Sequence, residues 1–176
     1  LVKELSTLKT QVFETYGMTE TLTHIAAKKI KEEAFHLLPN INITQDDRNC
    51  LVIDAPGIAV ESVVTNDLIE LVGDRQFLLI GRIDNVINSG GIKLIPEQIE
   101  DKLISKINSR FFVAGIPDNV LGEKLILVIE GQKQNLDDTI FDDLDKYEKP
   151  KEVFYVKKFA ETDNGKVKRK EILENI

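Results

Sequence analysis

The stretch 12–26, VFETYGMTETLTHIA, places Tyr16, Gly17, Thr19 and Glu20 between two apolar runs. A hydroxyl and a carboxylate just past a strand can hold a phosphate oxygen and the Mg²⁺ that accompanies it. An aromatic ring beside them offers a stacking face. Tyr and Gly alone are an ordinary strand end, but the added Thr and Glu favour a site for a phosphorylated ligand.

Three further segments carry polar or basic side chains at suggestive positions. They are TND at 65–67, GRIDNVINSGGIKLIPEQIE at 81–100 and ETDNGKVKRKEI at 161–172. Taken alone, Asp67 is a turn aspartate, Arg82 is a surface ion-pair partner, and residues 89–91 form a tight hairpin turn. The pair Gly165-Lys166 resembles a phosphate loop only superficially, because the Ser/Thr and the upstream Gly of a Walker motif are missing. The charges around this pair are typical of a solvated helix face.

The order and spacing of these four segments resemble the adenylate-forming superfamily of acyl-CoA synthetases, peptide-synthetase adenylation domains and luciferases. The resemblance covers nearly the whole chain but corresponds only to the later part of such an enzyme. It implies two steps. A carboxylate attacks the α-phosphorus of ATP to give acyl-AMP and pyrophosphate, and the CoA thiol then attacks the acyl carbon and releases AMP. ATP, Mg²⁺, CoA and a small carboxylic acid are the implied ligands.

The resemblance assigns a role to each residue of the YGMTE segment. The ring of Tyr16 would pack on adenine, and Gly17 belongs to the same nucleotide-binding segment. Thr19 would contact the α-phosphate, and Glu20 would help to hold the metal ion. The catalytic residues implied here are therefore Thr19 and Glu20.

The resemblance also covers the segment that joins the two halves of the chain. Asp67 would accept both ribose hydroxyls, and Arg82 would reach the ribose or a phosphate. Asp84 would be the hinge about which a C-terminal lid swings. The family usually shows Thr-Gly-Asp where this chain has Asn66, a residue that tolerates a left-handed backbone better than most.

In the second half, the resemblance singles out a glycine and a lysine. Gly91 would let the pantetheine arm of CoA pass, because backbone without a side chain leaves room. Lys166 would enter the site in the first half-reaction and touch the carboxylate and the α-phosphate. The family commonly has a proline upstream of this lysine, whereas this chain has Ala160 and Glu161.

The acid is suggested by the residues after the motif. YGMTET followed by THIA looks closest to o-succinylbenzoate–CoA ligases of menaquinone synthesis, so Thr23 and His24 would meet the substrate. A lone histidine after a strand is more often a packed or surface group. Two alternatives stay open: a ligase for another aryl or fatty acid, and a non-catalytic fragment that binds nucleotide or a partner protein. The phosphate loop that such enzymes carry upstream is absent from the chain, so we expect this piece to be inactive alone. We also expect its first 80 residues to lack packing partners, which would allow a homodimer.

Composition narrows the class of protein further. The chain has 176 residues, a formal charge of −7 and an isoelectric point near 5.0, which argues against a protein that coats nucleic acid or anionic lipid. The single cysteine, Cys50, excludes an internal disulfide and a Cys-rich zinc site and favours a reducing cytoplasm. The longest apolar runs, such as residues 125–129, are too short to span a bilayer.

The pattern of apolar residues predicts an α+β fold. Val/Ile/Leu-rich runs between turns predict strands from 41 to 80, and two short strands over a Ser-Gly-Gly turn follow. We expect helices at 96–107, 137–147 and 168–176, and strands at 111–116, 123–131 and 152–159. With the resemblance, this gives a β-rich, distorted barrel-like end of a large N-terminal domain over 1–81, joined to a mobile α+β lid domain over 82–176 in which helices flank a short sheet.

Overall fold

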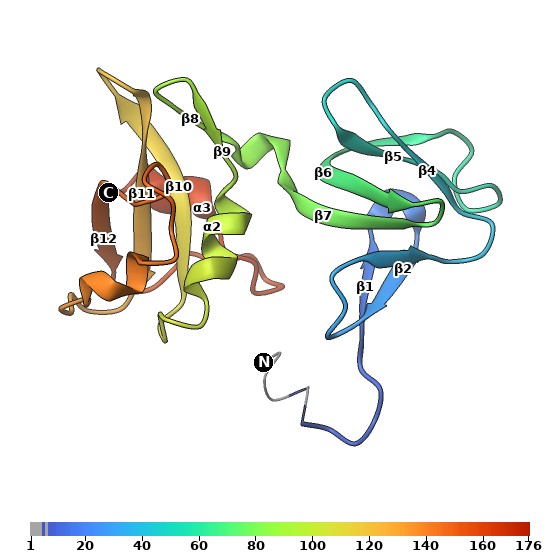
Figure 1. Cartoon of the computed structure of the whole chain (residues 1–176), viewed down its shortest axis with the longest axis horizontal. Helices are drawn as coiled ribbons and strands as arrows, with labels where there is room; N and C mark the ends of the chain where they lie inside the picture. Colours follow the sequence, from blue (N-terminus) through green and yellow to red (C-terminus); the bar gives the residue numbers. More distant parts are fainter. Residues whose placement is uncertain (1–4, 6) are drawn as a thin grey trace. The chain divides into compact units, whose positions relative to one another are not determined.

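The computed structural model describes residue 5 and residues 7–176, so residues 1–4 and 6 of the expected first domain lie outside it (Figure 1). The chain divides into two compact units, one ending at Asp84 and the other comprising Asn85–Ile176. Within the described residues, no helix combines the length and the apolar character needed to cross a membrane. The assignment of the second unit as a mobile lid stays a prediction.

The first unit is a seven-stranded antiparallel sheet. Its strands are β1 (Phe13–Gly17), β2 (His24–Lys29), β3 (Phe35–Leu37), β4 (Asn42–Gln45), β5 (Cys50–Asp54), β6 (Val63–Gly73) and β7 (Gln76–Arg82). They pair in the order β1-β2-β3-β7-β6-β5-β4. Because β1 and β4 are the two edges and do not pair with each other in the described part of the chain, the sheet is open. The β-rich first unit expected from the resemblance is confirmed, and its sheet does not close into a barrel.

The sequence missed β2 and β3. His24–Lys29 contains two alanines and two lysines, which have low strand propensity, and Phe35–Leu37 is only three residues long. The pairing of these two strands is stabilised instead by packing in the hydrophobic core. Phe35 is fully buried and stacks on Phe77 of β7 with ring centroids 5.4 Å apart. Tertiary packing thus decides a strand that local pattern does not.

The second unit places β11 (Gly122–Glu130) at the centre of a five-stranded sheet. This strand pairs antiparallel with β10 (Phe111–Asp118), parallel with β12 (Glu152–Val156) and, at one end, with β8 (Ile87–Ser89), which continues into β9 (Ile92–Leu94). The helices are α2 (Pro96–Leu103) and α3 (Arg169–Leu173). The sequence predicted all of these elements, with longer bounds for both helices and for β12.

The two faces of this sheet are covered by different helices. Leu125, Leu127 and Ile129 pack in one core with Ile99 and Leu103 of α2. Ile126 and Val128 pack in a second core with Ile172 of α3. A strand buried on both faces reads as one continuous apolar run, which is why LILVI shows no alternation. The expected α+β unit, with helices flanking a short sheet, is confirmed.

The helix expected over 137–147 is wrong. The structure has only a short 3₁₀ helix, η3 (Asp138–Phe141), followed by turns. The segment contains five aspartates, which compete with the backbone for hydrogen bonds and favour caps and turns. Asp137 shows this directly, because its carboxylate accepts a hydrogen bond from the backbone nitrogen of Thr139 at 3.0 Å. The apolar spacing that suggested a helix serves instead to anchor Leu144 in the core.

An ion pair joins the two helices across the end of the sheet. Glu100 of α2 accepts a hydrogen bond from Arg169 Nη2 at 2.9 Å and one from the backbone nitrogen of Val113 at 2.8 Å, and Arg169 Nη1 lies 2.9 Å from Glu100 Oε1. Burial raises the pKa of the Glu100 carboxyl, and Arg169 opposes that shift. The Arg169 guanidinium also lies 5.3 Å from the ring centroid of Phe112.

We expect Arg169→Ala to lower the free energy of unfolding by about 3 kcal/mol, because it leaves the Glu100 carboxylate buried without its cation. Removing the cation raises the pKa of Glu100 further, so the loss should be largest near neutral pH and shrink as acid protonates the carboxyl. Urea unfolding measures both effects. The matched control is Lys168→Ala, because the exposed Lys168 pairs with Glu171 on the surface at 3.2 Å. Equal losses in the two variants would contradict the prediction.

Candidate functional site

The connection between β1 and β2 is a tight turn that presents two of the expected site residues. Thr19 and Glu20 lie in the 3₁₀ helix η1 (Thr19–Thr21), and both side chains are exposed. Leu22 at the tip of the turn adopts a left-handed backbone, with φ 58°, which is uncommon for a large side chain. The chain then returns at Thr23 and His24, whose Oγ1 and Nδ1 atoms are 3.3 Å apart at the surface.

Thr21 stabilises this turn, a role that was not predicted from the sequence. Its side chain is fully buried, and its Oγ1 accepts a hydrogen bond from the backbone nitrogen of Met18 at 3.1 Å. The same hydroxyl can donate to the carbonyl oxygen of Thr23 at 2.8 Å or to that of Met18 at 3.0 Å. A threonine three residues after the start of a turn can bond to the backbone in this way, and that spacing was the available signal. Thr21 therefore fixes the direction in which Thr19 and Glu20 point.

Tyr16, Asp67 and Arg82 come together in the first unit. The strand register places Asp67 of β6 opposite Arg82 of β7, and Arg82 Nη1 donates to Asp67 Oδ1 at 2.9 Å. The hydroxyl of Tyr16 donates to the other carboxylate oxygen, Oδ2. Thr65 completes the arrangement, because its Oγ1 accepts from the backbone nitrogen of Asp67 at 3.1 Å. Three residues that the sequence singled out separately thus form one polar cluster, in which Tyr16 and Asp67 are buried and Arg82 is exposed.

The ring of Tyr16 is itself part of the core. It makes edge contacts with Phe35 and Phe77, with ring centroids 5.9 and 5.5 Å apart, and only 9% of the residue is exposed. Burial, followed by the hydrogen bond to Asp67, raises the pKa of the Tyr16 hydroxyl far above its usual value. The hydroxyl is therefore a neutral donor to Asp67. Stacking of its ring on a base stays a prediction.

We expect Tyr16 to remain un-ionised for as long as the chain is folded. Its raised pKa stabilises the fold fully below the ordinary tyrosine pKa of about 10, and this contribution is lost as pH rises beyond that value. The phenolate absorbance of the parent chain and of Tyr16→Phe should coincide until circular dichroism reports unfolding, and differ by one tyrosine afterwards. A Tyr16 phenolate signal near pH 10 in the folded chain would contradict the prediction.

The expected hinge residue, Asp84, is tied into the same cluster. It lies in the short helix η2 (Ile83–Asn85), and Arg82 Nη2 donates to its Oδ2 at 2.8 Å. This hydrogen bond is the main cause that raises the pKa of Arg82 above its usual value. Asn66 donates from Nδ2 to both Asp84 oxygens at 3.1 and 3.2 Å.

The second unit carries the other two expected site residues. Gly91 lies in the exposed β8–β9 turn with φ +83°, a conformation that favours glycine, and a Cβ there would meet nothing within 4 Å. Lys166 is exposed at the end of a turn closed by two hydrogen bonds with Thr162: Thr162 N to Lys166 O at 2.9 Å, and Lys166 N to Thr162 Oγ1 at 3.1 Å. In the described part of the chain, the Lys166 ammonium makes no ion pair.

A metal ion at Glu20 would need ligands from outside the protein. The described residues contain no group of three or more His, Cys, Asp and Glu side chains that could hold a metal. Mg²⁺ commonly takes one or two carboxylates and completes its shell with substrate phosphates and water. An exposed carboxylate on a turn fits that kind of site.

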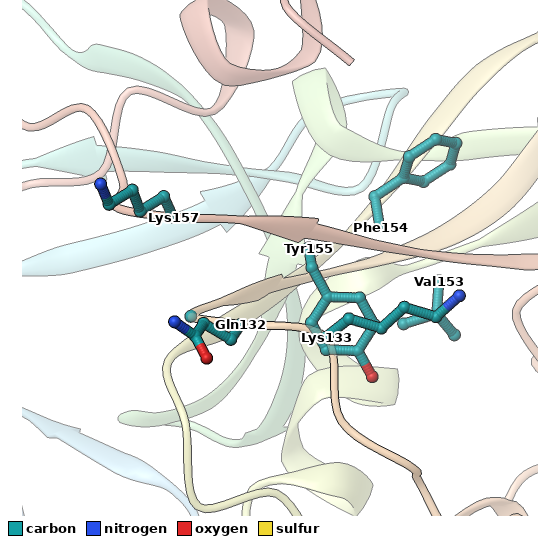
Figure 2. Close-up of a pocket in the computed structure, with 7 residues that line it drawn as sticks. Gln132, Lys133, Val153, Phe154, Tyr155 and Lys157 are labelled. Carbon is teal, nitrogen blue, oxygen red and sulfur yellow. The ribbon is translucent and has the colours of Figure 1, made fainter.

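A separate cavity of about 560 Å³ lies beside β12, between this strand and the segment 131–133. Figure 2 shows Val153 and Tyr155 on one side of the strand and Phe154 on the other. The hydroxyl of Tyr155 donates to the carbonyl oxygen of Gln134 at 2.9 Å. None of the site residues expected from the sequence lines this cavity.

The chain is similar to several known proteins, although no protein-family model matches it. It is 27% identical over 199 residues to the 2-succinylbenzoate–CoA ligase of Lactococcus lactis, an alignment that covers 98% of this chain and 43% of that protein. The chain therefore spans less than half the length of this curated relative.

Two solved structures extend the similarity to three dimensions. An acyl-CoA synthetase (AMP-forming)/AMP-acid ligase II-like protein from Dyadobacter fermentans is 36% identical, with a TM-score of 0.52 over 99% of this chain and 53% of that one. The Bacillus subtilis o-succinylbenzoate–CoA synthetase, solved with the acyl-adenylate OSB-AMP, is 20% identical, with a TM-score of 0.83 over 97% of this chain and 43% of that one. At that identity, the second match shows the shared fold alone.

Proposed function

Because the relatives and structural neighbours of this chain are AMP-forming acyl-CoA ligases, we propose that the chain is the later part of such a ligase. The whole enzyme would activate a carboxylate as acyl-AMP and transfer the acyl group to the thiol of CoA. The observation that carries the proposal is the cluster of Tyr16, Asp67 and Arg82 beside a turn that exposes Thr19 and Glu20.

The cluster has the chemistry to hold a ribose. A carboxylate has two oxygens and about four lone-pair sites, so Asp67 retains acceptor capacity after its bonds to Tyr16 and Arg82. Both bonds fix the carboxylate plane, so that the remaining lone pairs can accept two neighbouring hydroxyls without reorganisation. Arg82 adds a positive charge for a phosphate oxygen.

The adenylation step needs cationic groups, because negative charge accumulates on the α-phosphate as the carboxylate attacks. Mg²⁺ would supply Lewis-acid charge stabilisation when bound. Glu20 would orient it, and Thr19 would donate a hydrogen bond to a phosphate oxygen. Lys166 would contribute the second cation. In the thioester step, Gly91 would leave space for the pantetheine arm of CoA.

For the acid, we propose o-succinylbenzoate. The support is the name of the Lactococcus relative and the acyl-adenylate bound to the Bacillus neighbour, together with two exposed polar residues after the motif, Thr23 and His24. A threonine hydroxyl and an imidazole N–H can donate to the free carboxylate or the ketone of that acid.

Nucleotide binding by this chain is the direct test. AMP should shift amide signals of the β1–β2 turn in an NMR titration, and Asp67→Asn should weaken binding by at least tenfold, because one charged acceptor for the ribose is lost. Asp54→Asn is the matched control, because Asp54 is exposed at the end of β5. Absence of AMP binding, or equal binding by both variants, would contradict the proposed site.

Activity and substrate need the remaining part of the enzyme. A chimera in which this chain replaces the matching 43% of the Lactococcus ligase supplies it. Acid-dependent exchange of pyrophosphate into ATP, measured over a panel of aryl, fatty and dicarboxylic acids, should be fastest with o-succinylbenzoate. Exchange that is faster with another acid would replace the proposed substrate and leave the ligase assignment in place.

A further inference from the structure

Asn66 occupies a position in the first unit that the proposed function does not use. Its Oδ1 accepts a hydrogen bond from Arg48 Nη1 at 3.2 Å, and its Nδ2 donates to the Asp84 carboxylate at 3.1 and 3.2 Å. A guanidinium can only donate and a carboxylate can only accept, so these two partners fix the orientation of the amide. Arg48 is itself held by Asp46, with 2.7 Å between Nη2 and Oδ2.

Asp84 and Asp67 are connected through one guanidinium. Arg82 donates from Nη1 to Asp67 at 2.9 Å and from Nη2 to Asp84 at 2.8 Å. Asp84 is thus held from two sides, by Arg82 and by Asn66. A ligand that engaged Asp67 or drew Arg82 away would therefore change the bonds of Asp84, and the reverse would also hold because coupling between sites is reciprocal.

The residue after Asp84 is tied to different partners. Asn85 begins the second unit, and its Nδ2 donates to Glu97 Oε1 of α2 at 2.5 Å. The side chain of Asp84 is therefore hydrogen-bonded within the first unit, and the side chain of Asn85 is hydrogen-bonded within the second unit. While both ties persist, backbone rotation is confined to the few bonds between them.

We propose that Asn66 is a positioning residue that holds Asp84 in place and couples it, through Arg82, to the ribose-binding carboxylate of Asp67. The coupling to a nucleotide rests on the proposed function, whereas the hold on Asp84 does not. Asn66→Asp replaces the amide donor by a carboxylate that faces Asp84 and repels it. The double variant Asn66→Asp, Asp84→Asn exchanges donor and acceptor and can remake the bond in the opposite direction.

Hydrogen exchange of the backbone amides of residues 83–86 in this chain tests whether Asn66 holds Asp84 in place. We expect Asn66→Asp to speed exchange about tenfold, as local opening becomes less costly, and the double variant to return it to within about twofold of the parent chain. Asn42→Asp, at an exposed position of edge strand β4, is the control. Unchanged exchange in Asn66→Asp, or no recovery in the double variant, would overturn the proposal.

The coupling is tested by adding AMP at saturation. AMP should alter exchange at 83–86 in the parent chain by more than twofold, and this response should be lost in Asn66→Asp. If AMP binds both chains and the response is the same, the coupling is refuted while the proposed function stands. If AMP binds neither the parent chain nor Asn66→Asp, the proposed function fails. Hydrogen exchange of residues 83–86 without nucleotide then decides whether Asn66 positions Asp84.

Discussion

Lys166→Ala is expected to slow the formation of acyl-AMP by about 10³ in the chimeric ligase described above. A cation about 4 Å from the developing charge, at an effective dielectric constant near 20, contributes roughly 4 kcal/mol to the transition state. Lys166 suits this role because its side chain is exposed and the described residues contain no carboxylate paired with it. Its backbone is fixed by the turn that Thr162 closes, so the ammonium projects from a defined point.

The two half-reactions separate this role from a general loss of structure. Acid-dependent pyrophosphate exchange reports adenylation, and thioester formation from supplied acyl-AMP reports the second step. Only the first should fall, because the extra negative charge that builds up on the α-phosphate during adenylation is relieved once pyrophosphate departs, before CoA reacts. Lys158→Ala removes another exposed lysine of the same unit and should leave both rates unchanged. An equal loss of both half-reactions in Lys166→Ala would rule out the proposed role.

Gly17→Ala is expected to lower the free energy of unfolding by at least about 3 kcal/mol and to abolish AMP binding by this chain. A Cβ on Gly17 would lie 2.5 Å from the carbonyl oxygen of Thr23 and 2.6 Å from the Cα of His24. Both atoms belong to the backbone and cannot move aside without displacing the returning strand. The turn that carries Thr19 and Glu20 would then lose its register with β1.

Gly73→Ala is the matched control, because Gly73 also ends a strand but a Cβ there would meet nothing within 4 Å. This variant should be neutral or slightly stabilising, since alanine restricts the unfolded chain. Urea unfolding and AMP titration of both variants give the comparison. A Gly17→Ala chain as stable as Gly73→Ala would show that the turn yields easily, and that Gly17 does not fix the site.

Much of the fold could be predicted because local chemistry and tertiary packing agree. The β-branched runs of β5, β6 and β11 and the proline-started helix α2 are examples. The sequence failed where the two disagree: the alanine and lysine residues of β2 conceal a strand that the Phe35–Phe77 core demands, and the aspartates of 137–145 end a helix that the apolar spacing favours.

The candidate site could likewise be predicted only in part. Tyr16, Thr19, Glu20, Asp67 and Arg82 could be proposed from motif and spacing, but their mutual contacts could not. Whether Asp67 faces Arg82 depends on the register of β6 against β7, and a shift by one residue would turn Asp67 to the opposite face. The bonds of Asn66 to Arg48 and Asp84 join residues 18 positions away on either side, a relation that only the folded sheet creates.

The central strand of the second unit has a consequence for how this unit comes apart. Residues 125–129 of β11 point alternately into the core under α2 and the core under α3. Detachment of either helix would expose one face of β11, and the other helix packs on the opposite face of the same strand. The unit therefore has no half that melts independently, and heat or denaturant should disassemble it as one cooperative block.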